Sequence, residues 1–163
     1  MTIEFFRFVS EDGTFAVAEA SLEDGTARLL PVLVITAAHS RFMLGRMIPT
    51  RCTEDLLLGS WELLQQLGRV PRRLIWDNES GIGRGKRRAE GVTPFIGTLA
   101  TRLVLLPPRD PESKGIVERR NGWFETSFMP GRTFTSPADF NTQFGDWQLA
   151  LAAYNWGEGS VAR

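Results

Sequence analysis

The hydrophobic pattern of this chain changes period near residue 50, and that change limits the folds it can adopt. Before it, residues 15–22, 28–36 and 42–48 form short apolar runs, which is typical of strands. Asp24-Gly25 separates the first two runs, and Gly25 can take the positive φ of a tight turn. We therefore predict a three-stranded antiparallel meander. A turn centred between these two residues would pair Glu19 with Leu30.

After this point the apolar residues follow a helical period. Thr53 is the predicted N-cap of a helix with Leu57, Trp61 and Leu64 on one face and Gly68 at its C-terminal turn. Residues 73–77 and 102–106 are predicted strands, with a glycine-rich loop at 78–91 and a short helix at 94–100 between them. Two more helices are predicted, one at 113–127 and one of about five turns that Ser136 caps.

Length and composition favour one globular domain. The chain has 163 residues, a formal net charge of zero and one cysteine, and it has no apolar run long enough to span a membrane. The single cysteine points to a reducing compartment, and we expect a cytoplasmic protein. The element order predicts an α/β fold: an RNase H-like mixed five-stranded sheet, its first three strands antiparallel, with helices on both faces. The single domain would occupy 1–163, with the core proper at about 12–156.

Two acidic residues are candidates for chemistry. Asp77 follows a predicted buried strand, and Glu118 lies on the predicted helix at 113–127. Two divalent ions about 4 Å apart need several carboxylates that converge from different elements, and this pair fits that need. The plainer alternatives are that Asp77 caps a turn and that Glu118 pairs with Lys114 on the same helix.

Two stretches around these acids resemble a known family. LIWDNESGIG at residues 74–83 and PPRDPESKGIVERRNGWFETSFMPGRTFTSPADFN at 107–141 resemble the DDE integrase-type catalytic core of IstA-like insertion-sequence transposases. Residues 114–119 resemble the family's Lys-Gly-x-Val-Glu-Arg helix start, and LPVLVITAAHSRF at 30–42 resembles its second strand. Tyr154-Asn155 resembles the end of its last core helix, so the resemblance covers residues 28–156.

The resemblance implies a function, metal ions and partners. It implies a transposase that cleaves DNA 3′ ends and transfers the strand into target DNA, with Asp77 and Glu118 as the second and third metal-binding acids. Two Mg²⁺ or Mn²⁺ ions, transposon-end and target DNA, a homo-oligomer, an IstB-like ATPase helper and a bacterial, nucleoid-associated location follow from it. DNA contacts are expected from basic side chains, namely Arg84, Lys86, Arg87, Arg88, Lys114 and Arg119.

The first acid of the triad is less obvious, because the family's Gln-x-Asp context is absent from this sequence. We choose Asp12, which would face Ala37 in the predicted hairpin, with Glu19 as the alternative. We also expect the flanking DNA-binding domains of the family to be absent. The alternative function is therefore a catalytically inactive transposase remnant that binds protein or DNA.

Overall fold

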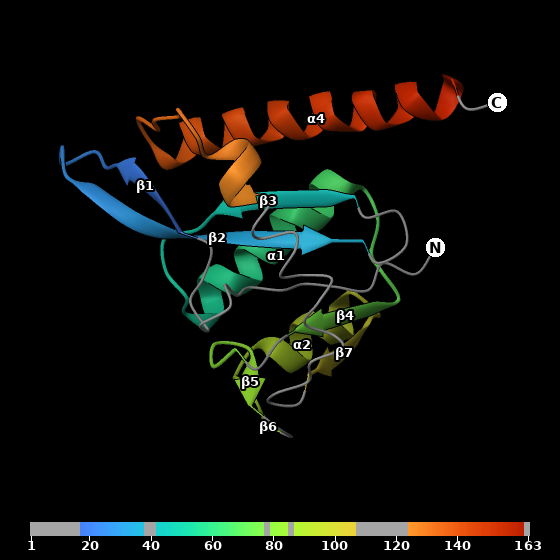
Figure 1. The fold of residues 1–163 in the computed structure, drawn as a ribbon. Helices are drawn as coiled ribbons and strands as arrows, with labels where there is room; N and C mark the ends of the chain where they lie inside the picture. Colours follow the sequence, from blue (N-terminus) through green and yellow to red (C-terminus); the bar gives the residue numbers. More distant parts are fainter. Residues whose placement is uncertain (1–16, 38–41, 77–78, 85–86, 107–123, 162–163) are drawn as a thin grey trace.

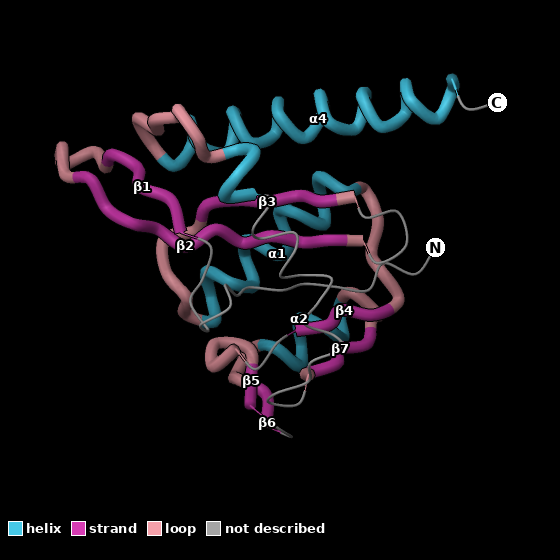
Figure 2. Tube along the Cα trace, viewed as in Figure 1, coloured by secondary structure: helices cyan, strands magenta, loops and turns pink. Residues whose placement is uncertain are grey.

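The fold is known from a computed structural model, which describes residues 17–37, 42–76, 79–84, 87–106 and 124–161. It is an α/β arrangement in which strands lie between helices (Figures 1 and 2). The strands are β1 Val17–Ser21, β2 Ala27–Thr36, β3 Met43–Met47, β4 Arg73–Trp76, β5 Gly83–Arg84, β6 Arg87–Arg88 and β7 Arg102–Leu105. The α-helices are α1 Thr53–Leu67, α2 Val92–Thr98 and α4 Pro137–Val161, and a π-helical turn, η1, spans Phe124–Phe128.

The N-terminal meander is confirmed, with β1, β2 and β3 in that order and both pairs antiparallel. Its first turn falls at Asp24-Gly25 as predicted, and Gly25 has φ of 79°. The predicted register is wrong by one residue, because Glu19 pairs with Leu29 and not with Leu30. The reason is a three-residue loop: the Leu22 N–H donates to the Thr26 carbonyl at 2.8 Å, which centres the turn on Asp24.

Helices cover both faces of β2, because successive strand residues point to opposite sides. Leu33 and Ile35 face a core that includes Leu63 of α1. Val32 and Val34 face a second core, which is mainly aromatic: Phe124, Phe128, Phe134, Phe140 and Phe144. The prediction of helices on both faces is therefore confirmed.

α1 ends as predicted and begins differently. Gly68 has φ of 69° and its N–H donates to the carbonyl oxygens of Leu64 and Gln65, which closes the last turn. The N-cap is Cys52 and not Thr53, because Thr53 already has helical geometry. The Cys52 side chain makes no capping bond.

The predicted apolar face of α1 is also displaced. Trp61 is 42% exposed, whereas Leu56, Gly59, Ser60, Leu63 and Leu64 are buried. A Cβ at Gly59 would stand 2.7 Å from a methyl carbon of Leu33 and 2.8 Å from one of Ile48. The helix therefore packs closely against Leu33 and Ile48 at a residue with no side chain, and the buried face centres there.

β4 and β7 form a parallel pair connected through α2. In the described ranges this pair has no hydrogen-bonded link to the three-stranded sheet, so the five-stranded sheet stays a prediction. Both sheets nevertheless share one core, which contains Leu33 of β2 together with Leu74 and Trp76 of β4. The predicted loop at 78–91 contains the short antiparallel pair β5–β6.

α4 starts at the predicted cap, where the Ser136 hydroxyl accepts the Asp139 N–H at 3.0 Å. It runs for 25 residues, roughly seven turns, which is longer than predicted. Of its predicted stripe, Phe140 and Phe144 are fully buried, but Tyr154 is 64% exposed. Most of the helix predicted at 113–127 lies outside the described residues, and its described end is η1. Within the described part, no helix has the length and apolarity needed to cross a membrane.

α4 seals the free edge of β3, which pairs only with β2 among the described strands. The Asn141 side-chain oxygen accepts the Met47 N–H at 2.7 Å, and the Gln148 amide donates to the Met43 carbonyl at 2.8 Å. Between them the Phe144 ring lies against Gly45. Because an open strand edge invites pairing with other chains, this helix protects the sheet from edge-to-edge association.

Candidate active site

The three predicted catalytic acids, Asp12, Asp77 and Glu118, lie outside the described residues, as do Lys86, Lys114 and Arg119. The structure does describe the elements next to several of them. Trp76 is the last residue of β4 and directly precedes Asp77, and η1 begins six residues after Glu118.

The carboxyl end of β4 is fixed by its neighbour. Trp76 is 2% exposed, and its carbonyl oxygen accepts the Leu106 N–H at 2.8 Å. β4 and β7 are parallel and their last residues pair, Trp76 with Leu105. The segments that leave these two strands therefore start at the same edge of the sheet, and such an edge is where α/β folds commonly place their sites.

A buried carboxylate that the sequence analysis missed follows this edge. Glu79 is 5% exposed as a residue, and its Oε2 accepts a hydrogen bond from the Arg51 guanidinium at 2.6 Å. Its Oε1 accepts the Gly81 N–H and the Ser80 hydroxyl, both at 3.3 Å. Both carboxylate oxygens accept hydrogen bonds from the protein, so in this arrangement Glu79 stabilises the local turn. The partner lies 28 positions earlier in the chain, which is why no local sequence signal predicted the pair.

Glu19, the alternative first acid, is exposed on β1, whereas Ala18 and Ala20 on the same strand are buried. Its partner in the sheet, Leu29, is 66% exposed, so this face of the hairpin is open. Figure 1 shows β1 at the end of the hairpin that projects away from β4.

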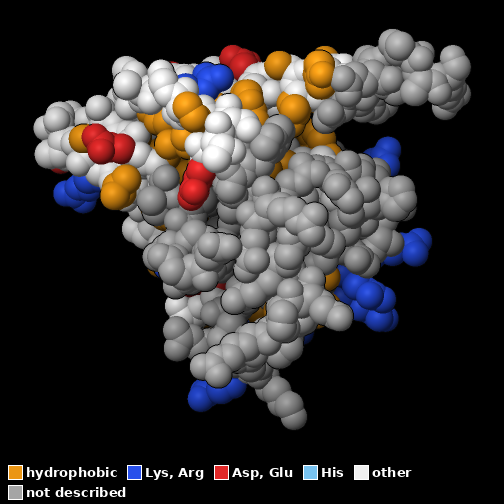
Figure 3. Space-filling model, in the orientation of Figure 1, with side chains coloured by type: hydrophobic (Ala, Val, Ile, Leu, Met, Phe, Trp, Pro, Cys, Tyr) orange, Lys and Arg blue, Asp and Glu red, His pale blue; other side chains and the backbone are white. Residues whose placement is uncertain are grey.

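The basic stretch after Asp77 forms a small hairpin. Arg84 on β5 pairs with Arg87 on β6, and Arg87 and Arg88 are both exposed. Neither Arg87 nor Arg88 forms an ion pair within the part of the chain that the structure describes. Figure 3 shows basic side chains at the tip of the molecule where Figure 1 places this hairpin. Exposed arginines are among the groups that contact phosphates in nucleic-acid binding proteins.

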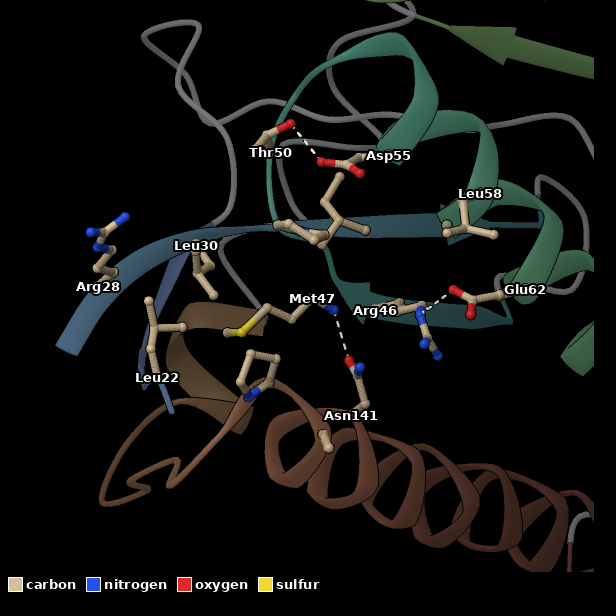
Figure 4. A pocket seen from close by; sticks show the side chains of 15 residues that line it. Leu22, Arg28, Leu30, Arg46, Met47, Thr50, Asp55, Leu58, Glu62 and Asn141 are labelled. Atoms are coloured by element: carbon tan, nitrogen blue, oxygen red, sulfur yellow. Dashed lines mark hydrogen bonds and ion pairs between the residues drawn. The ribbon is translucent and has the colours of Figure 1, made fainter. Parts of the chain in front are cut away.

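A groove of about 570 Å³ lies between β3, α1 and the start of α4 (Figure 4). Its lining is mostly apolar, with Leu30, Met47 and Leu58 among the contributors. The Arg46–Glu62 ion pair lies on one wall at 2.5 Å. Among the described residues, no group of three or more His, Cys, Asp or Glu side chains suited to a metal occurs.

The sequence matches no protein-family model, and it matches no curated protein. The fold does match solved structures. A chain of the simian T-cell lymphotropic virus intasome in complex with the PP2A regulatory subunit B56 gamma matches with a TM-score of 0.61 at 16% identity over 88% of this chain. The present chain spans 48% of that chain, about half its length.

The HTLV-2 integrase catalytic core domain in complex with magnesium, in its trimeric form, matches with a TM-score of 0.52 at 12% identity. That match covers 77% of this chain and 68% of the HTLV-2 chain. Identities this low establish the fold alone. The fold resembles that of these retroviral integrase catalytic cores, which agrees in general form with the predicted RNase H-like α/β fold.

Proposed function

We propose that this chain is the catalytic core of an IstA-like DDE transposase, acting on DNA 3′ ends and joining them to target DNA. The observation that carries the proposal is the integrase-core fold, in which Asp77 directly follows the carboxyl end of β4. Asp12 and Glu118 are proposed as the other two acids. Glu118 is assigned by its resemblance to the family's Lys-Gly-x-Val-Glu-Arg pattern, and Asp12 by its place in the predicted hairpin.

The donor set fits a hard divalent cation, because three carboxylates supply only oxygen ligands. One of the solved neighbours is an integrase core in complex with magnesium, and we propose Mg²⁺ or Mn²⁺ for this chain. When bound, two such ions supply activation of the attacking oxygen and stabilisation of the leaving oxygen. The chain's own part is to hold the three carboxylates together and to hold DNA against them.

In the proposed reaction, a water oxygen attacks a phosphorus at the transposon end, and the P–O3′ bond breaks to leave a 3′-hydroxyl. That hydroxyl then attacks a phosphodiester of the target, and the target's own 3′-oxygen leaves. Each step exchanges one P–O bond for another, so no oxidant or further co-reactant is needed. Arg84, Lys86, Arg87, Arg88, Lys114 and Arg119 are proposed to bind the DNA phosphates.

The partners are also proposals. One solved HTLV-2 core is trimeric and another is dimeric, which supports a homo-oligomer here. The IstB-like helper and the cytoplasmic, nucleoid-associated location rest on the family resemblance alone.

The alternative is a remnant that binds protein or DNA without chemistry. The absence of the family's Gln-x-Asp context from the sequence favours it, because no motif then marks the first acid. Under this alternative the fold would persist and the carboxylates would bind no cation.

Nicking of supercoiled plasmid by the full chain in Mn²⁺ or Mg²⁺ separates the two functions. We expect metal-dependent nicking that falls at least about 100-fold in Asp77→Asn and in Glu118→Gln, because each removes a metal ligand. Glu62→Gln, which changes an acid in a separate ion pair, should leave nicking unchanged. Nicking that survives both ligand substitutions, or no nicking at all, would favour the remnant.

DNA contact by the hairpin has its own test. In Arg87→Ala or Arg88→Ala, affinity for duplex DNA should fall, and the slope of log K against log salt should decrease by about one per contact removed. Arg28→Ala is the matched control, since Arg28 is an exposed arginine on the other hairpin. An unchanged salt slope in both hairpin variants would argue against this DNA surface.

A further inference from the structure

Residues 79–83 form a tight turn that is organised around Glu79. The Glu79 carbonyl oxygen accepts the N–H groups of Ile82 at 3.0 Å and Gly83 at 2.8 Å. Its carboxylate accepts the Gly81 N–H, so three successive backbone donors converge on one residue. Gly83 is the first residue of β5, and the same turn therefore sets where the basic hairpin starts.

The Glu79 carboxylate is held by a charge from another element. Its side chain is 4% exposed, and a buried carboxylate is costly unless it is paired. Arg51 supplies the pairing charge from the residue before the N-cap of α1. The Arg51 side chain is 47% exposed. The acid of this pair is therefore buried, whereas the base lies partly at the surface.

Close packing makes this attachment rigid. A Cβ at Gly81 would stand 2.6 Å from the Arg51 carbonyl oxygen and 2.6 Å from a methyl carbon of Leu56. The turn thus lies directly on the first turn of α1, with no space for a side chain between them. Ile82 is 1% exposed beside it, in the core that also contains Leu56 and Trp76.

Asp77 lies in the chain between two fixed points. Trp76 precedes it in β4, and Glu79 follows it by two residues. Because consecutive Cα atoms are about 3.8 Å apart, the Cα atom of Glu79 can lie no more than about 8 Å along the chain from that of Asp77. Glu79 is not one of the acids of the proposed active site.

We propose that Glu79 and Arg51 form a positioning brace that fixes Asp77 for cation binding and sets the basic β5–β6 hairpin relative to it. Glu79 is then a positioning residue and not a metal ligand. This inference rests on the proposed function, since it assigns the brace a role toward the cation that Asp77 is proposed to bind.

The test combines Mn²⁺ affinity with amide hydrogen exchange on the full chain. Glu79→Gln keeps the shape of the side chain and removes its charge. We expect the amides of Gly81, Ile82 and Gly83 to exchange at least about tenfold faster, with those of β2 unchanged. Mn²⁺ affinity should fall about tenfold, the lower end of the range for residues that support a metal ligand.

Two further variants make the test specific. Arg51→Lys keeps the positive charge and should retain most of the Mn²⁺ affinity, whereas Arg51→Ala should behave like Glu79→Gln. Glu62→Gln breaks the Arg46–Glu62 pair, whose acid is 32% exposed, and should leave Mn²⁺ affinity unchanged.

The outcomes separate the brace from the function. If Asp77→Asn weakens Mn²⁺ binding but Glu79→Gln does not, the brace is overturned and the proposed function stands. If exchange quickens in Glu79→Gln while Mn²⁺ affinity holds, the pair is structural only, and the positioning role is again overturned. If the unsubstituted chain binds no Mn²⁺, or Asp77→Asn binds it equally well, the proposed function fails and the positioning role fails with it.

Discussion

Replacing Gly45 with alanine is expected to destabilise the fold strongly, although it adds a single methyl group. Gly45 lies on β3, directly under the ring of Phe144 from α4. A Cβ built at this position overlaps the ring: Cε1 is nearest, and Cδ1 and Cζ both stand 2.9 Å away. Carbon atoms in ordinary contact are about 3.5–4.0 Å apart, so the ring must retreat.

The ring has little space to do so. Phe144 is fully buried and contacts the rings of Phe124, Phe128 and Trp147 with centroids 5.3, 4.8 and 5.5 Å away. Overpacking a core costs about 1–3 kcal/mol, and a shift of α4 would also weaken the Asn141 and Gln148 hydrogen bonds to the β3 edge at about 1 kcal/mol each. We therefore expect a loss of about 2–4 kcal/mol, which lowers Tm by roughly 5–15 °C for a chain of this size.

Urea unfolding followed by far-ultraviolet circular dichroism measures this loss. Gly145→Ala is the matched control, because a Cβ at Gly145, the next residue of α4 after Phe144, meets nothing within 4 Å. It should stabilise the helix by about 0.5–1 kcal/mol, since alanine is the better helix former. Gly45→Ala combined with Phe144→Leu should lose less than the sum of the single variants. A Gly45→Ala change of less than about 0.5 kcal/mol would refute this account of how α4 packs on β3.

Three smaller changes probe separate features. Asn141→Ala leaves the Met47 N–H without its acceptor and should lower the free energy of unfolding in urea by about 1–2 kcal/mol. Asn141→Asp keeps an acceptor and should lower it less. Equal losses in the two variants would contradict the edge-sealing role. Gly68→Ala should cost about 1 kcal/mol from backbone strain alone, because φ is 69° and no atom lies within 4 Å of the new Cβ; a neutral effect on Tm would contradict it. Hydrogen bonds from the Thr135 backbone N–H, then from side chains, hold the pKa of Asp139 below its ordinary 3.8. The stability that Asp139 adds to the folded state should be fully present above about pH 4 and should be lost as the pH falls through the lowered folded pKa. A pKa at or above 3.8 for this carboxyl, measured by NMR titration, would contradict this.

The elements of the fold were largely predictable because their signals are local. The Asp24-Gly25 turn, the Ser136 cap and the Gly68 terminus each depend on residues a few positions apart, and all three are found. The one-residue register error shows the limit of this reasoning. Whether Asp-Gly forms a two-residue or a three-residue loop depends on the strands that flank it, which the dipeptide does not specify.

The packing of the helices was less predictable, because glycines guide it. Gly59 and Gly45 let α1 and α4 approach the sheet. Neither contributes to a hydrophobic pattern in the sequence, because glycine has no side chain. Asn141 and Gln148 are polar residues on a buried helix face, and their position makes sense only once the β3 edge offers an unpaired N–H and carbonyl. These are contacts between residues about a hundred positions apart, which a periodic pattern does not contain.

In the candidate site, too, the features with a local sequence signal were predictable and those that depend on distant residues were not. The strand end before Asp77 was predicted from a local apolar run, and β4 ends one residue before Asp77. The burial of Glu79 was not predicted, because an acid in a glycine-rich loop is ordinarily solvated. Its burial depends on Arg51, which folding brings to the same turn.

Mn²⁺ binding by the full chain, measured by isothermal titration calorimetry, tests the central claim most directly. We expect Asp77→Asn, Glu118→Gln and Asp12→Asn each to weaken binding by about tenfold or more, because each removes one carboxylate from a shared cation site, while Glu19→Gln leaves it unchanged. A matching loss in Glu19→Gln but not in Asp12→Asn would assign the first acid to Glu19. Equal Mn²⁺ affinity in the unsubstituted chain, Asp77→Asn and Glu118→Gln would contradict the proposal that this integrase-type fold carries a metal-dependent active site.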